Sequence, residues 1–184
     1  LDHRVWSLAA ALFELGVRKG DIVAVQLPNI SELVEVLLAC MRMGAVVSPL
    51  SMQYSGHELT YMAGLLRPAA FVTVTRFKQG SAAEAVAPIC RAFACRLLTF
   101  GQRRPEDALD LEALAGRSDP ATLRARLQSD PVSPNDLMTL CWTSGTTGMP
   151  RAVPRTHNLW YAIGRAKTIP RDSNFLGTFP FINM

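Results

Sequence analysis

Short apolar runs alternate with amphipathic segments along most of this chain of 184 residues. One apolar run covers residues 22–27, a helical pattern follows over residues 29–43, and a second apolar run covers residues 45–49. A strand, a helix and a strand in this order imply two parallel strands joined by a right-handed crossover. The sequence therefore predicts an α/β fold of alternating strands and helices, with a largely parallel sheet and helices on its faces.

The rest of the chain continues the same alternation. Residue spacing predicts helices over 4–15, 57–66, 81–94, 122–128 and 157–167, and strands over 71–75, 96–100 and 137–142. Asn29 with Glu32 three positions later predicts a capping box at the start of the 29–43 helix. Pro88 is expected to end or kink its helix. The charged stretch 101–120 is interpreted as a loop-rich surface excursion.

The composition narrows the class of protein. Hydrophobic residues make up 49% of the chain and charged residues 18%, which is typical of a globular domain and excludes disorder. The net charge of +4 comes without a run of basic residues, so no nucleic-acid partner is expected, whereas anionic ligands fit. The longest apolar stretch, residues 33–50, contains Glu35 and Arg42, so we expect no membrane span. Cys40, Cys90, Cys95 and Cys141 are expected to be reduced, buried thiols, which favours a cytoplasmic protein.

A run of Ser, Thr and Gly residues, Thr143 to Gly148, directly follows the apolar segment 137–142. The run offers four hydroxyl groups and a backbone free enough to turn several N–H groups toward one point, which suits a phosphate group. Arg151 then supplies a positive charge with a planar set of donors. The spacing of Gly145 and Gly148, with no Gly-Lys pair after them, excludes a Walker A loop. The run predicts a polyphosphate-binding loop.

Thr143 to Arg151 resembles the signature loop of the adenylate-forming superfamily, which includes acyl-CoA synthetases and other AMP-binding ligases. The usual form is Thr-Ser-Gly-Thr-Thr-Gly, any residue, then Pro-Lys-Gly. This chain departs from it with Arg151 in place of Lys and Ala152 in place of Gly. Further similarity lies at residues 15–24, 27–32, 43–50 and 179–184, so the resemblance runs from about residue 5 to the last residue.

The resemblance implies a reaction in two half-reactions. A carboxylic acid and ATP give an acyl-adenylate, and a thiol, either coenzyme A or a phosphopantetheine on a carrier protein, then takes the acyl group. ATP with Mg²⁺ is the expected nucleotide. The residues predicted to hold it are Thr143, Ser144, Gly145, Thr146, Thr147, Gly148 and Arg151. His157 and Asn183 are candidates for binding the acid substrate; no catalytic residue and no metal ligand is predicted.

The resemblance also implies that residues 1–184 form part of a larger N-terminal AMP-binding domain, with the later part of that domain and a C-terminal lid domain absent. We therefore expect the chain alone to be inactive. Residues 153–158 resemble aryl-acid AMP ligases, so an aryl or small aliphatic acid is favoured. Two alternatives stay open. Arg151 and Ala152 are compatible with a nucleotide-binding pseudo-enzyme, and in a non-catalytic scaffold the Ser/Thr/Gly run would be only a turn.

Overall fold

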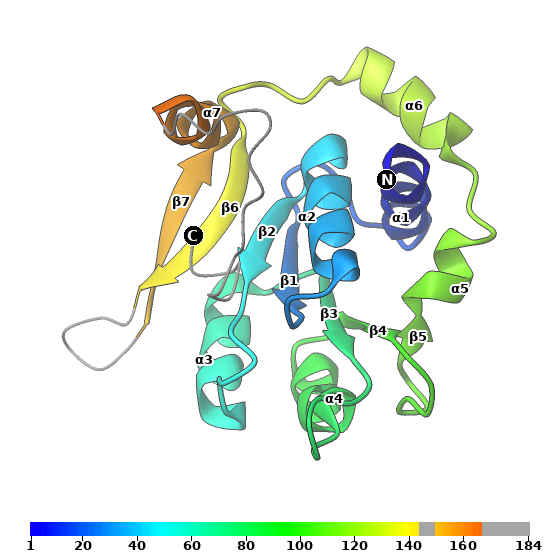
Figure 1. Ribbon diagram of the computed structural model, residues 1–184, viewed down its shortest axis with the longest axis vertical. Coiled ribbons are helices and arrows are strands. Elements are labelled where there is room, and N and C mark those ends of the chain that lie inside the picture. The colour runs from blue at the N-terminus through cyan, green and yellow to red at the C-terminus, as the bar shows by residue number, and fades with distance from the viewer. Residues whose placement is uncertain (144–149, 167–184) are drawn as a thin grey trace, which may run out of the picture.

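A computed structural model describes residues 1–143 and 150–166 of the chain. Its centre is one sheet with the strand order β5-β4-β3-β1-β2-β6-β7 (Figure 1). The strands are β1 Ile22–Gln26, β2 Val46–Pro49, β3 Ala70–Val74, β4 Arg96–Phe100, β5 Leu109–Asp110, β6 Leu137–Thr143 and β7 Arg151–Thr156. The helices are α1 Asp2–Glu14, α2 Ser31–Met43, α3 Gly56–Leu66, α4 Ala82–Ala92, α5 Leu111–Ala115, α6 Pro120–Ser129 and α7 His157–Ala166.

All pairs in the sheet are parallel except β6 with β7. β1 lies between β2 and β3, because α2 leads the chain to one side of β1 and α3 leads it back past β1 to the other side. Every residue of β2 and β3 is buried, and four of the five residues of β1 are buried. Strands covered on both faces explain why the apolar runs in the sequence are continuous rather than alternating.

Helices cover both faces of this sheet (Figure 1). One core cluster joins α1, α2, α5 and α6 to side chains such as Val25, Val47 and Leu98. The second cluster joins α3 and α4 to side chains of the opposite parity, including Ala24, Phe71 and Leu97. Because successive residues of a strand point to opposite faces, the two clusters are separate layers, and the domain has three layers.

The predicted fold class is confirmed. The eight strands and helices predicted between residues 4 and 100 are present, with boundaries that differ by up to two residues. The capping box at Asn29 is wrong, because the N-cap position is Ile30, with no side-chain cap, and Glu32 is therefore at the second helical position rather than the third. A tight turn, with the Ile30 N–H donating to the Pro28 carbonyl at 2.8 Å, displaces the helix start. The capping box that does form is at α3, between Ser55 and Glu58.

Three other points differ from the expectations or add to them. α4 continues through Pro88 to Ala92, so of the two expected effects of Pro88, ending the helix does not occur. The stretch 101–120 is not only a surface excursion, because β5 pairs with β4, and α5 places Leu111 in the first core cluster with no exposed surface. The strand β7 was not predicted; it contains Pro154, which a strand tolerates at the edge of a sheet, and β7 is the edge strand.

Two expectations from the composition can be compared with the structure. All four cysteines are buried and unbridged, as predicted. Within residues 1–143 and 150–166, none of the helices combines the length and the apolar character needed to cross a bilayer.

Leu98 tests the two-sided burial of the central sheet. Its side chain has no exposed surface and lies on β4 beside β3, so Leu98→Ala leaves a cavity and should lower the free energy of unfolding by about 2–5 kcal/mol. Leu65 on α3 is 57% exposed, and Leu65→Ala should change stability by less than about 0.5 kcal/mol. Urea denaturation followed by circular dichroism measures both. Equal losses in the two variants would contradict the position of β4 in the core.

Candidate functional site

The Ser/Thr/Gly run begins at the carboxyl edge of the sheet. β6 is parallel to β2, with Val47 opposite Thr139, and β2 is parallel to β1, so these strands end at one edge. Thr143 is the last residue of β6 and lies at this edge. In open parallel sheets, ligands bind in crevices outside the carboxyl ends of the strands. The attachment point of the predicted loop is therefore at the edge where such folds place their ligands.

The segment that follows the run is a strand rather than a helix. β7 returns antiparallel to β6, with Arg151 opposite Thr143, and the Thr143 hydroxyl donates to the Arg151 carbonyl at 3.5 Å. Both side chains are exposed. The structure thus brings together the first and last residues of the predicted nucleotide site. Ser144, Gly145, Thr146, Thr147 and Gly148 lie outside the described residues.

Two aromatic side chains attach this hairpin to the rest of the domain. The Trp142 indole N–H donates to the Ser48 hydroxyl at 2.8 Å, and the Trp142 ring packs against the second core cluster. The Trp160 indole N–H donates to the Thr139 hydroxyl at 2.8 Å and so holds α7 against β6. Thr139 and Cys141, on one face of β6, are buried, whereas Met138, Leu140 and Trp142, on the other face, are half-buried.

A crevice of about 240 Å³ lies at the same carboxyl edge. It is formed by residues at or after the ends of β1, β2 and β3, together with α3 and α4, and its polar lining includes Gln26, Tyr54, Ser55 and Ser81. Because α2 and α4 leave β1 and β3 toward opposite faces, the crevice is at a topological switch point, where the ends of neighbouring strands separate. The sequence analysis missed these residues; the available signal was their position after successive strands.

The chemistry of the crevice suits a polar or anionic ligand. The Gln26 side chain donates to the Ser51 carbonyl at 2.9 Å, which fixes its orientation. Burial, with a contribution from the charge of Glu58, raises the pKa of Tyr54, so its hydroxyl stays a hydrogen-bond donor at neutral pH. Arg76 and Lys78, the chain neighbours of the lining residue Phe77, are exposed and add positive charge to this segment.

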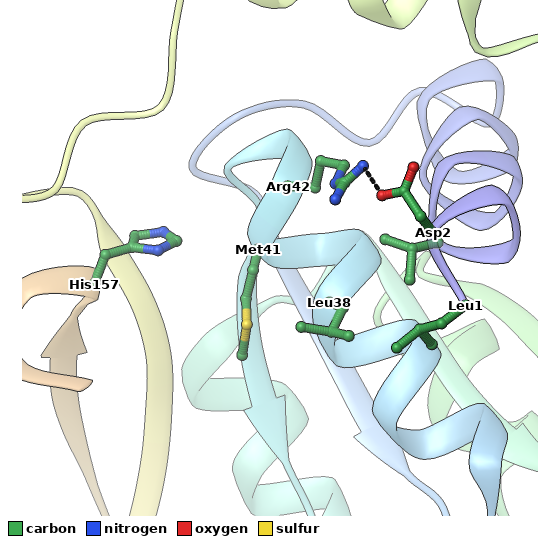
Figure 2. Close-up of a pocket in the computed structure, with 7 residues that line it drawn as sticks. Leu1, Asp2, Leu38, Met41, Arg42 and His157 are labelled. Carbon is green, nitrogen blue, oxygen red and sulfur yellow. Dashed lines mark ion pairs between the residues drawn. The ribbon is translucent and has the colours of Figure 1, made fainter. Parts of the chain in front are cut away.

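His157 lies at the opposite edge of the sheet. It follows β7, whose last residue Thr156 is opposite Leu137, the first residue of β6. A strand of this length spans roughly 20 Å, so His157 is far from Thr143. Figure 2 shows its ring directed toward Met41 of α2, across a cavity of about 460 Å³ that also contains the ion pair of Arg42 with Asp2. The structure therefore does not bring His157 to the predicted nucleotide loop.

Burial and one neighbouring carboxylate shift the pKa of His157. Its Nε2 atom is buried without a hydrogen-bond partner among the described residues. Burial lowers the pKa of His157, and the nearby charge of Asp136 raises it by less. Asn183, the other predicted contact to the acid, lies outside the described residues. Within the described ranges, no group of three or more His, Cys, Asp or Glu side chains is arranged to hold a metal ion.

Comparison with known proteins identifies the family. A family model described as AMP-binding enzyme matches residues 1–183, and the chain belongs to this family of adenylate-forming enzymes. A salicylyl-CoA synthase / salicylate adenylyltransferase from Streptomyces sp is 35% identical over 162 residues, which cover 86% of this chain and 29% of that protein. A 2-hydroxy-7-methoxy-5-methyl-1-naphthoate–CoA ligase from Streptomyces carzinostaticus is 35% identical over 98% of this chain and 34% of its own length.

Solved structures agree with this assignment. The crystal structure of ATP-bound MatB from Rhodopseudomonas palustris matches with a TM-score of 0.66 and 26% identity, over 85% of this chain and 28% of that chain. The chain thus spans about a third or less of the length of the relatives compared here. The mixed α/β fold with its mostly parallel sheet is that of the large domain of adenylate-forming enzymes.

The lowered pKa of His157 generates a pH prediction. Because the folded-state pKa lies below the ordinary value of 6.5, the unfolded chain takes up a proton first as the pH falls, and the folded state loses stability below about pH 6.5. His157→Gln should remove this loss. Urea denaturation of both proteins between about pH 7.5 and pH 5.5 measures it, as the difference between their unfolding free energies. Parallel curves, or a wild-type protein that gains stability toward low pH relative to the variant, would refute the prediction.

Proposed function

We propose that the protein containing this chain activates a carboxylic acid with ATP to an acyl-adenylate and transfers the acyl group to a thiol, as an acid–thiol ligase of the acyl-CoA synthetase type. The observation that carries the proposal is the position of Thr143 and Arg151, the two ends of the predicted nucleotide site, which lie opposite each other at the carboxyl edge of a parallel sheet. Membership in the AMP-binding enzyme family supports the reaction class.

The chain's own residues would stabilise the negative charge that develops on the pyrophosphate as it leaves. In the first half-reaction an oxygen of the acid attacks the α-phosphorus of ATP and pyrophosphate leaves, so negative charge builds up on the leaving group. Donors fixed beforehand around that charge stabilise the transition state without having to reorganise. We assign this role to the hydroxyl and N–H groups of residues 143–148 and to the Arg151 guanidinium. Mg²⁺ bound to the triphosphate would neutralise further charge, and it is held largely by phosphate oxygens and water rather than by a protein cage.

The acid is proposed to be aromatic, and the thiol to be coenzyme A. The two relatives from Streptomyces act, by their names, on salicylate and on a substituted naphthoate, which supports the first of the two classes, aryl or small aliphatic acid, expected from the sequence. The crevice beside Gln26 and Tyr54 is the proposed region for the thiol substrate, because it shares the carboxyl edge with the loop and because Arg76 and Lys78 suit phosphate groups. An aryl-acid AMP ligase that feeds a carrier protein is the alternative. A relative that favours it is the vanchrobactin synthetase of Vibrio anguillarum, 31% identical over 159 residues, which are 85% of this chain and 5% of that protein.

Residues 1–184 would be the first part of the large domain of a longer enzyme, with the remaining acid-binding residues and the lid domain elsewhere in the protein. On this basis residues 1–184 alone are proposed to be inactive. A cytoplasmic location is proposed as well, in line with four unbridged cysteines.

Acid-dependent exchange of labelled pyrophosphate into ATP tests the proposed reaction. The full-length protein that contains this chain should catalyse exchange with salicylate or another aryl acid, at a higher kcat/KM than with a medium-chain fatty acid, because a flat ring and a flexible chain need pockets of different shape. A panel of both classes at equal concentration is the measurement. Saturable ATP binding without exchange for any acid would favour the pseudo-enzyme alternative, and absence of ATP binding would favour the scaffold.

Arg151 provides a sharper test of the nucleotide site. Arg151→Met removes a charged donor and should lower kcat/KM for ATP by about 10- to 100-fold, whereas Arg151→Lys keeps the charge and should retain most of the activity. Arg155 is the matched control, since it lies four residues further along β7, on the same face of the strand but toward the opposite edge of the sheet. Arg155→Met should change kcat/KM for ATP little. An equal loss at the two positions would show that Arg151 acts only through the general charge of the hairpin.

A further inference from the structure

Two cysteines meet where α4 ends and β4 begins. The N–H of Cys95 donates to the carbonyl of Cys90 at 3.0 Å, and the N–H of Ala94 donates to the carbonyl of Arg91 at 3.3 Å. Ala94 has a φ of 54°, in the left-handed region. These two hydrogen bonds and the left-handed residue define a Schellman motif, which frequently brings the side chains at its two outer positions together. These positions are commonly apolar; here they hold Cys90 and Cys95, and both belong to the second core cluster.

The end of α2 offers an internal comparison. It has the same pair of hydrogen bonds, from Ala45 to the Cys40 carbonyl at 2.9 Å and from Gly44 to the Met41 carbonyl at 3.3 Å. Cys40 therefore occupies the position that Cys90 occupies in α4, but its partner position holds Ala45. Cys40 also belongs to the core cluster on the opposite face of the sheet from Cys90 and Cys95. The Schellman motif at the end of α4 therefore has cysteines at both outer positions, Cys90 and Cys95. The motif at the end of α2 has a cysteine, Cys40, at only one of them.

The surroundings of the pair make one sulfur the nucleophile. The hydrogen bond from the Cys90 thiol lowers the pKa of Cys95, whereas the same interaction and burial raise the pKa of Cys90. Arg91, which lies next to Cys90 in the chain, is bound to Asp107 at 2.7 Å. Both residues are buried, and Cys95, at 8% exposure, is slightly more exposed than Cys90, at 3%.

We propose that Cys90 and Cys95 form an oxidation site that a hydroperoxide converts to an intramolecular disulfide. The Cys95 thiolate attacks one oxygen of the peroxide, the O–O bond breaks, and hydroxide leaves, which gives a sulfenic acid on Cys95. The Cys90 sulfur then attacks the Cys95 sulfur, the S–O bond breaks, and the hydroxyl group leaves as water with the Cys90 proton. Two thiols are oxidised and one hydrogen peroxide is reduced to two molecules of water. The product joins the last turn of α4 to the start of β4.

The sequence allows a direct test, because Arg91 lies between the two cysteines. Trypsin cleaves after Lys78, Arg91 and Arg96, so Cys90 and Cys95 fall in separate peptides, 79–91 and 92–96. The folded full-length protein is treated with hydrogen peroxide until glutathione in the same sample is oxidised. Remaining thiols are then alkylated under denaturing conditions, and the digest is analysed by mass spectrometry without reductant. The two peptides should appear linked, and reductant should separate them.

Variants and the unfolded protein provide the controls. Cys90→Ser and Cys95→Ser should each abolish the linked peptide, and Cys141→Ala should retain it, since Cys141 interacts with the Thr139 hydroxyl rather than with the pair. The same treatment in urea should give mixed pairings that include Cys40 and Cys141. If both peptides of the folded wild-type protein remain alkylated while glutathione is oxidised, or if either cysteine is oxidised to sulfinic acid without linkage, the proposal is overturned.

Discussion

The parallel alignment of β6 with β2 is the constraint on which the candidate site depends. It places the end of β6 at the same edge as the ends of β1, β2 and β3, and the hydrogen bond from Trp142 to Ser48 fixes that end laterally. If β6 paired antiparallel with β2, the Ser/Thr/Gly run would leave the sheet at the opposite edge, away from the crevice. The direction of this one strand pair therefore decides whether the end of β6 and the crevice lie at the same edge of the sheet.

The domain combines a rigid centre with a lightly covered side. β1, β2 and β3 are buried on both faces, while β6 and β7 expose much of their surface, and no residue of α7 within its described length is fully buried. The hairpin that carries Thr143 and Arg151 therefore lies on the least buried side of the described residues. It is attached to the buried centre through Trp142 and Ser48.

Local sequence patterns predicted strands and helices correctly where burial is continuous. They failed where an element depends on partners distant in the sequence. The strand at residues 96–100 was predicted to the residue, since three of its five side chains are apolar, four of the five are buried, and it lies between two other strands. β7 was missed, because Ala152 and Pro154 are of types depleted in strands and only its pairing with β6 makes it a strand. Leu111 was assigned to a surface stretch, because charged residues precede it in the sequence. In the structure Leu111 begins α5, which α1 and β4 bury.

The candidate site shows the same division. The sequence by itself determined the chemistry: a hydroxyl-rich run followed by Arg151, an α/β fold around it, and thiols kept away from solvent. These follow from residue type and short-range periodicity, which depend on neighbours in the chain. Only the tertiary structure decided how far apart the candidate site residues lie. It joined Thr143 to Arg151 across a hairpin, placed His157 at the far edge, and brought Gln26, Tyr54 and Ser81 to one crevice. Strand order and direction set those distances, and they result from burying the whole sheet at once, which no short segment specifies.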